Sequence, residues 1–240
     1  MTTLCFDFGN TRLKVAIFEQ RNFKEEIYLQ DDAPSTIQSV LEKYKPAKTI
    51  LASVINHDPG LETVLAASSR FHKLSITTKL NFTTPVGKPE TIGADRLALI
   101  AASVHFYPGK NSLIIGLGSC ITYNFVNQYG HFLGGSISPG MDMRFKSMHD
   151  FTAKLPLVQA DWNFPLIGYD TKTNLQSGVI MGMASEIDGI IEKYSQKYDN
   201  FNVVLTGGNS AYFASQLKNK IFADAYFLFK GLYALSELNN

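Results

Sequence analysis

The sequence predicts a duplicated α/β protein. Two apolar runs, 4–8 and 13–18, flank the turn Gly9-Asn10 and are typical of a β-hairpin. A second hairpin pattern spans 113–126, with its turn at Gly118-Ser119. Each turn would present backbone N–H groups and small polar side chains to one point, which suits a phosphate. Because each hairpin pattern begins one half of the chain, its repetition indicates a duplication.

The first half continues with alternating strand and helix patterns. Segment 34–44 has apolar residues at helical spacing and a proline near its start, so it predicts a helix. A turn signal at 58–60 separates a short apolar strand from a second helix. A third helix begins at Gly93, with its apolar residues on one face. After the hairpin we therefore expect a strand at 23–29, a helix at 34–44, a strand at 49–54, a helix at 61–69, a strand at 74–78, a loop at 81–91 and a helix at 93–105.

The second half repeats this alternation with a longer helix. Three apolar stretches within 113–137 predict three strands, which end in a glycine-rich run at 134–140. Segment 150–172 is polar and contains prolines, so it predicts an irregular connection. We then expect a helix at 174–198, a strand at 202–205, a helix at 210–217, a strand at 223–229 and a helix at 231–238.

Composition argues against several classes of function. The chain has 240 residues, is 45% hydrophobic and carries a net charge of +1, without a dense basic run, so no nucleic-acid partner is expected. No apolar run approaches the ~18 residues of a membrane span, and residues 1–20 lack a signal-peptide core. We therefore expect a cytoplasmic protein without membrane contact. Cys5 and Cys120 are expected to be reduced packing residues, and no histidine pair has the spacing of metal ligands.

The segment 7–14 is a candidate phosphate-and-magnesium corner. Asp7, at the end of a predicted strand, could hold a hydrated cation, while Asn10, Thr11 and nearby backbone N–H groups could bind phosphate oxygens. Lys14 could add positive charge. The alternative is an ordinary hairpin with polar turn residues.

Three further motifs each allow a functional and a structural interpretation. The run Thr206-Gly207-Gly208 follows a strand and could clamp adenosine, or it could be a strand-to-helix turn. The tetrad at 93–96 could supply a base near an anion site, or an acidic first turn with a solvated arginine. The run 134–140 could approach a ligand or a partner strand, and a β-turn is favoured. Neither a P-loop nor a dinucleotide-binding glycine motif is present.

Together these motifs resemble those of the type III pantothenate kinases, a branch of the superfamily of acetate and sugar kinases, heat-shock chaperones and actin. The resemblance runs from Asp7 to Leu235, nearly the whole chain, and its pieces occur in the family's order. One such motif would be weak, but six in order are specific. They lie at 7–14, 93–96, 118–122, 134–140, 206–208 and 222–235.

The resemblance implies an ATP-dependent kinase that makes 4′-phosphopantothenate, the first step of coenzyme A biosynthesis. It also implies a homodimer whose chains have two ribonuclease H-like α/β halves, here 1–112 and 113–240, with a nucleotide cleft between them. Asp95 matches the family's general base. The pantothenate site maps to Gly93, Ala94, Asp95, Arg96 and Thr171. The ATP site maps to Asp7, Phe8, Gly9, Asn10, Thr11, Arg12, Leu13, Lys14 and Ser119, and the predicted adenosine clamp adds Gly207 and Gly208.

These assignments agree with the chemistry of phosphoryl transfer, which is mostly positioning and charge neutralisation. Asp95 would accept the proton of the attacking hydroxyl group, and Arg96 would pair with a substrate anion or the transferred group. Asp7 would hold Mg²⁺, through water. Thr11 and Ser119 would donate hydrogen bonds to phosphates from the two hairpins.

The second hairpin departs from the family's usual Asp-x-Gly-Thr-Ala-x-Thr-x-Asp pattern. Gly116 stands in place of the first Asp, which in the family binds a monovalent cation, K⁺ or NH₄⁺. Ser119 replaces the Thr and keeps its hydroxyl group, and Asn124 replaces the last Asp. We predict that the cation site is lost or is rebuilt from backbone carbonyls. In addition, the loop before Gly93 offers Phe82 where the family tends to place a pantothenate-contacting Tyr.

Two other functions remain alternatives at this point. One is a fold-retaining binding or regulatory protein with weak or no kinase activity, since relatives have been described as Bvg accessory factors. Gly116 and Asn124 favour it. The residues that favour the kinase are Asp7, Thr11, Asp95 and Arg96. The other is a kinase for a different small molecule, because a fold does not fix a substrate.

Overall fold

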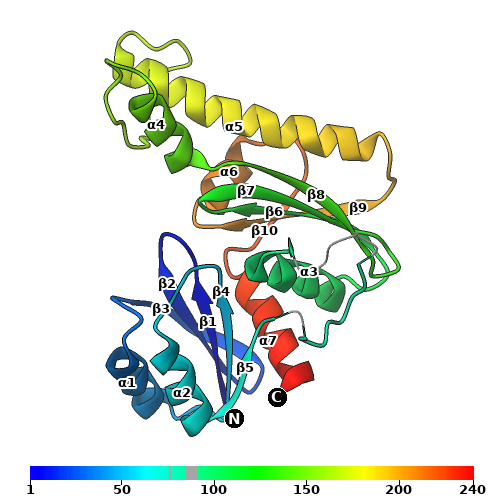
Figure 1. Cartoon of the computed structure of the whole chain (residues 1–240). Coiled ribbons are helices and arrows are strands. Elements are labelled where there is room, and N and C mark those ends of the chain that lie inside the picture. Colours follow the sequence, from blue (N-terminus) through cyan, green and yellow to red (C-terminus); the bar gives the residue numbers. More distant parts are fainter. Residues whose placement is uncertain (76, 85–90) are drawn as a thin grey trace. The chain divides into compact units, whose positions relative to one another are not determined.

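The computed structural model describes residues 1–75, 77–84 and 91–240. These residues form two compact units and two five-stranded sheets (Figure 1). The first unit comprises 1–109, 126–134 and 226–240, and the second comprises 110–125 and 135–225. The chain thus returns to its first unit at the C-terminus, and the division at residue 112 stays a prediction. Of the loop predicted at 81–91, residues 85–90 lie outside the described residues.

The first sheet has the predicted opening hairpin and third strand. Its strand order is β3-β2-β1-β4-β5, in which β1 is antiparallel to β2 and parallel to β4. The strands are β1 Thr2–Phe8, β2 Leu13–Glu19, β3 Asn22–Leu29, β4 Lys48–Ser53 and β5 Arg70–Lys73. Helices α1 Pro34–Tyr44 and α2 Pro59–Ser68 lie between strands of this sheet in the chain, and α3 Ala94–Phe106 follows its last strand.

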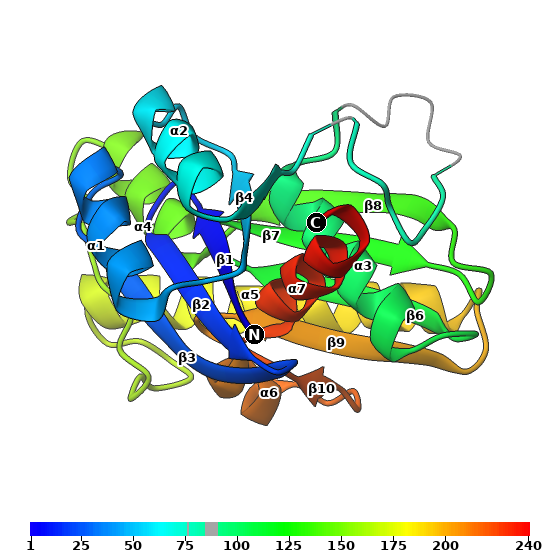
Figure 2. The same ribbon diagram turned by 90° about the horizontal axis from the view of Figure 1, so that it is seen from below.

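Side-chain alternation gives the first sheet two different faces. Leu4, Phe6 and Phe8 of β1 join one hydrophobic cluster with buried residues of α1 and α2. Figure 2 shows these two helices on one side of the blue strands and the C-terminal helix α7, Phe227–Asn239, on the other. On that second side, Phe18 of β2 stacks on Tyr233 of α7. The residues of β1 between the phenylalanines, including Asp7, therefore belong to the face that α7 covers.

The second sheet repeats the strand order of the first, and this confirms the duplicated α/β fold. Its order is β10-β9-β6-β7-β8, so a run of three consecutive strands is again extended by a strand parallel to its first member. The strands are β6 Asn111–Leu117, β7 Cys120–Val126, β8 Phe132–Pro139, β9 Phe201–Gly207 and β10 Phe222–Ala223. The remaining helices are α4 Met141–Asp150, α5 Thr171–Ser195 and α6 Ser210–Gln216.

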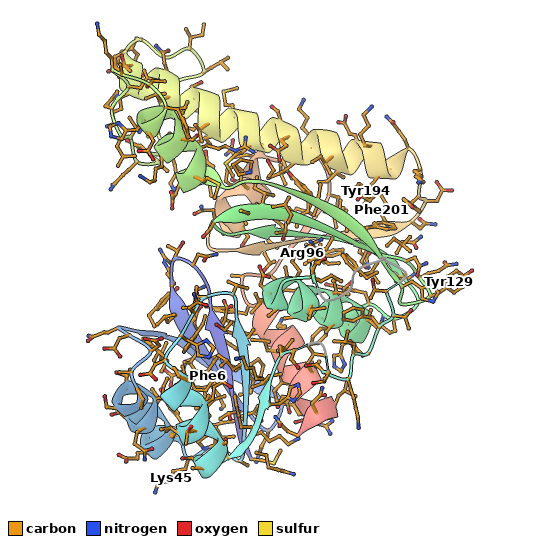
Figure 3. The ribbon with its side chains drawn as sticks, viewed as in Figure 1. Phe6, Lys45, Arg96, Tyr129, Tyr194 and Phe201 are labelled. Atoms are coloured by element: carbon orange, nitrogen blue, oxygen red, sulfur yellow. The ribbon has the colours of Figure 1, made fainter. Side chains whose placement is uncertain are left out.

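The long helix α5 covers one face of the second sheet. It begins three residues before the predicted start because Asp170 caps it, accepting a hydrogen bond from the Thr173 backbone N–H at 2.7 Å. At its other end, Tyr194 packs on Phe125 of β7, which also contacts Phe201 of β9 (Figure 3). Alternating residues of β6 and β7 complete this core.

The strand predicted at 223–229 is wrong beyond its first residue. Only Phe222–Ala223 pair with β9, and α7 begins at Phe227. The buried residues Phe227, Gly231 and Leu235 recur at helical spacing, and α7 packs against α3. A Cβ at Gly231 would lie 1.9 Å from the Ala98 carbonyl oxygen, so glycine is needed for this close helix packing. Tertiary packing thus prevails over the local apolar run.

Two smaller predictions also change. The strand predicted at 74–78 is wrong for its described residues, because β5 ends at Lys73 and the Thr78 amide donates to the Ser75 carbonyl, while residue 76 lies outside the described residues. Helix α4 was not predicted, although Met141, Phe145 and Met148 show helical spacing. Both cysteines are unpaired, with Cys5 buried and Cys120 half-buried. Among the described residues, no helix is both long enough and apolar enough to cross a bilayer.

Candidate functional site

Asp7 lies near the C-terminal end of β1, on the sheet face that α7 covers. The register places Lys14 of β2 on one side of it and Ala52 of β4 on the other. Helix α3 contacts α7 and β4, and therefore lies on the same face. The fold in this way brings Asp7 and Asp95, the second residue of α3, into one electrostatic environment.

The charges around Asp7 make it an unusual carboxyl group. Burial raises its pKa to about 7; Lys14 lowers this pKa, and the carboxylates of Asp95 and Glu26 raise it. A divalent cation would relieve the repulsion between these carboxylates. Mg²⁺ typically binds through one or two carboxylates while its other ligands are water and phosphate, so the Asp7 corner fits it. Over the described ranges, no three His, Cys, Asp or Glu side chains gather as a metal cluster.

Lys14 is held in place by residues that the sequence motifs did not predict. Its ammonium nitrogen lies 2.9 Å from a carboxylate oxygen of Glu26 in β3. The same nitrogen lies 5.5 Å from the ring centre of Tyr28 and 6.0 Å from that of Phe229. The register would have revealed Glu26, because it pairs with Ala16 and is thus diagonal to Lys14 on one face. Lys14 therefore sets the charge around Asp7 from a fixed position.

The turn between β1 and β2 is built as predicted. The Gly9 amide donates to the Arg12 carbonyl at 3.1 Å and closes the turn. The side chains of Asn10, Thr11 and Arg12 are exposed. Phe8 is fully buried and Leu13 packs against the same hydrophobic cluster, so the side chains of these two residues anchor the turn.

The start of α3 places a carboxylate and a guanidinium side by side. Gly93 is the N-cap residue, and a Cβ there would lie 2.6 Å from Oδ1 of Asp95. Glycine therefore leaves room for the Asp95 carboxylate to fold back over the helix start. The Arg96 guanidinium lies 5.6 Å from the ring centre of Phe132 (Figure 3). Burial lowers the pKa of Arg96, and the neighbouring Asp95 opposes this.

The second hairpin turn belongs to the second unit and is braced by glycine. The Gly118 amide donates to the Cys120 carbonyl at 3.0 Å, and the Gly140 amide donates to the Ser119 carbonyl at 3.0 Å. A Cβ at Gly140 would lie 2.3 Å from the Gly118 carbonyl oxygen, and one at Gly135 would lie 1.7 Å from that of Tyr123. The glycine-rich run 134–140 thus lies mostly in strand β8, close to the backbone of its neighbour β7, and the favoured β-turn is wrong.

The two glycines after β9 differ from each other. Gly207 has φ of +103°, and a Cβ there would lie 2.2 Å from the Leu117 carbonyl oxygen. It is therefore required for packing against β6, with which it is in register. A Cβ at Gly208 would meet nothing within 4 Å, so the backbone there is open to a ligand. Of the predicted clamp, Gly208 is the residue with space beside it.

Gly116 and Asn124 are the positions at which the second hairpin departs from the family pattern. Gly116 is the second-to-last residue of β6, as Asp7 is of β1. The buried Asn124 amide group donates to the Ile114 carbonyl at 3.3 Å and to the Thr122 hydroxyl at 3.2 Å. A carboxylate could not donate these bonds, so Asn124 serves the packing of this hairpin.

The last predicted site residue, Thr171, is exposed as the first residue of α5. The predicted residues thus fall into two groups. The first unit holds the Asp7 corner and the 93–96 tetrad, and the second holds Ser119, Thr171 and the glycines after β9.

Comparison with known proteins gives a consistent result. A family model described as type III pantothenate kinase matches residues 3–193. A type III pantothenate kinase of Christiangramia forsetii is 41% identical over 239 residues, which cover 98% of each chain. One of Bacteroides fragilis strain YCH46 is 39% identical over 241 residues, covering 99% of this chain and 98% of the relative.

Solved structures share the fold at low sequence identity. A Campylobacter jejuni protein proposed to be a Baf family transcriptional activator has a TM-score of 0.62 at 20% identity, covering 98% of both chains. A Listeria monocytogenes protein proposed to be an N-acetylmannosamine kinase has a TM-score of 0.56 at 11% identity over 100% of both chains.

Proposed function

The chain belongs to the type III pantothenate kinase family, and from this premise we propose that it transfers the γ-phosphoryl group of ATP to pantothenate with Asp95 as the general base. The product is 4′-phosphopantothenate, and the reaction is a phosphoryl transfer to an alcohol in coenzyme A biosynthesis. The observation that carries the residue assignment is the electrostatic coupling of Asp95 to Asp7 on one face of the first sheet. Two coupled carboxylates can divide the work between base and metal ligand.

Asp95 is placed to handle the proton of the acceptor hydroxyl group. It lies in the first turn of α3, where the helix dipole favours a negative charge. Gly93 leaves space for its carboxylate, and Arg96 follows directly to pair with a substrate anion or the transferred group. Asp95 accepts the proton as the hydroxyl oxygen attacks the γ-phosphorus atom.

Asp7 is the residue that would hold Mg²⁺. When bound, the metal supplies neutralisation of the phosphate charge. In its absence the Asp7 carboxyl has a pKa of about 7, and a nearby cation favours the ionised form. Glu26 and Lys14 fix the surrounding charge through their 2.9 Å contact.

The remaining assignments follow from exposure and open space. The exposed Asn10 and Thr11 and the hydroxyl group of Ser119 would bind phosphates, and Gly208 would face the adenosine. Thr171 would contact pantothenate. We include a homodimer and a cytoplasmic location in this proposal. A K⁺ or NH₄⁺ site is either lost or formed by backbone carbonyls, because Gly116 has no side chain.

The test is ATP-dependent phosphorylation of pantothenate by the purified protein with Mg²⁺, in parallel potassium and sodium buffers. We expect turnover in both buffers. Strong stimulation by potassium would contradict the loss of the cation site. Absence of turnover from the folded protein in both buffers would overturn the kinase and favour a binding role or another acceptor.

A further inference from the structure

We propose that Trp162 and Tyr212 form a stacked aromatic platform on which the adenine ring of ATP binds. This proposal rests on the proposed function and adds the residues that recognise the base. The ring centres of Trp162 and Tyr212 are 3.6 Å apart with an angle of 26° between the planes. Phe213, which is fully buried, meets the indole edge-on at 6.0 Å and 87°. Trp162 nevertheless remains 39% exposed, so it has surface left for a second flat ring.

The segment that carries Trp162 is fixed on both sides. Trp162 is the central residue of a turn in which the Asn163 amide donates to Oδ1 of Asp161 at 3.0 Å. Upstream, the side chain of Gln176 in α5 donates to the Gln159 carbonyl at 3.0 Å. Downstream, Ser177 of α5 donates to the Leu166 carbonyl at 2.9 Å. These anchors hold the indole in place before a ligand arrives, which reduces the entropy lost on binding.

The platform lies next to the open glycine turn. Tyr212 is the third residue of α6, the helix that follows Gly207-Gly208 directly. Side chains of a helix lean toward its N-terminus, so Tyr212 leans toward the end of α6 that adjoins Gly208. The backbone at Gly208 is open, as described above, whereas Gly207 is closed by Leu117. A nucleoside lying along Gly208 would therefore place its base against Trp162.

Stacking also predicts which ligands would use the platform. Every purine has a π-face, so adenine and guanine should both bind there, and a phosphate chain without a base should not. Because the stacking energy of a base on an aromatic ring corresponds to roughly a 5- to 150-fold change in affinity, its loss should be easy to measure.

The experiment uses the intrinsic fluorescence of the full-length protein, since Trp162 is its single tryptophan. Binding of ADP with Mg²⁺ should quench or shift the emission, and tripolyphosphate should leave it unchanged. Unchanged emission at a concentration of ADP that calorimetry shows to be saturating would overturn the proposal.

Three variants separate stacking from packing. Trp162→Phe keeps a π-face and should retain most of the affinity for ATP. Trp162→Leu keeps an apolar contact with Tyr212 but has no π-face, and should raise the KM for ATP about 5- to 150-fold with kcat unchanged. Trp162→Ala should behave like Trp162→Leu. Affinity for tripolyphosphate should be equal in all of them.

Equal KM values for the Phe and Leu variants would show that Trp162 only packs on Tyr212, and would overturn the platform while leaving the kinase intact. Failure of the proposed function itself would be seen separately, as the absence of pantothenate phosphorylation by the unmodified protein.

Discussion

The opening hairpins of the two sheets hold the same place in the same strand order, yet only the first carries a carboxylate at its end. Strands β1 and β6 have the same sequence of buried and half-buried positions, and their second-to-last residues are Asp7 and Gly116. The neighbouring parallel strand places Ala52 beside the first and Thr206 beside the second. The hydrophobic pattern that forms the hairpin tolerates either residue here, so in the proposed function a single side chain distinguishes the hairpin that would hold a cation.

The starts of α3 and α4 form a second matched pair. Each helix has glycine as its N-cap residue and aspartate as its second residue, Asp95 in α3 and Asp142 in α4. Asp95 is coupled to the carboxyl group of Asp7, whereas Asp142 is exposed. The same local sequence is therefore proposed to serve catalysis only at α3, where the fold supplies a second carboxylate.

The largest expected effect is that of Asp95→Asn. Turnover of pantothenate should fall by roughly 10²–10⁴-fold, the usual contribution of a general base, while ATP binding persists. Asp142→Asn is the control, because it removes an aspartate from the same position of another helix. A near-normal kcat for Asp95→Asn in a steady-state assay would refute the assignment.

Gly93→Ala should have the next largest effect. The added Cβ would lie 2.6 Å from Oδ1 of Asp95 and would displace that carboxylate. We expect kcat to fall by roughly 10–100-fold, since a displacement of about 1 Å can cost this much. Gly189→Ala, where a Cβ would meet nothing within 4 Å, should leave kcat unchanged. Similar rates for the two variants would show that the position of Asp95 does not depend on Gly93.

Gly116→Asp tests the comparison of the two hairpins directly. It gives β6 the carboxylate that β1 has, so activity should become several-fold higher in potassium than in sodium, because a fixed carboxylate is a hard oxygen ligand for a cation. The measurement is the ratio of initial rates in the two buffers. An unchanged ratio would indicate that the cation site needs more than this side chain.

Asp7→Asn should change stability in a pH-dependent way. The pKa of Asp7 is about 7 in the folded protein and has an ordinary value of 3.8, so the folded state binds this proton more tightly. The contribution of Asp7 to the free energy of unfolding is therefore fully present below a pH of about 4. It is lost as the pH rises to about 7, and the loss is at most about 4 kcal/mol.

Urea unfolding at pH 5 and pH 8 without metal measures this effect. The free energy of unfolding of Asp7→Asn relative to the unmodified protein should increase between these two values of pH. Adding Mg²⁺ at pH 8 should reduce the difference in free energy of unfolding between Asp7→Asn and the unmodified protein. A difference that does not vary with pH would contradict the burial of a charge at Asp7.

Much of the fold could be read from local patterns. Both hairpins, the helix at 34–44 and the irregular connection before α5 follow from apolar spacing and turn residues. The strand predicted at 223–229 was wrong, because an apolar run is equally consistent with a strand and a helix. Only the packing of α7 on α3 decides between them. The contact of Glu26 with Lys14 was not predicted either, because strand register depends on pairing between separate segments and not on neighbouring residues.

The sequence by itself determined the family, the order of the motifs and the loss of a carboxylate at Gly116, because these depend on residue identity alone. Only the tertiary structure decided that Asp7 and Asp95 share one environment, that Gly207 is needed for packing while Gly208 is open, and that Trp162 stacks on Tyr212. Burial, electrostatic coupling and ring stacking arise between residues far apart in the chain, and their energies depend on distances that only the folded chain sets.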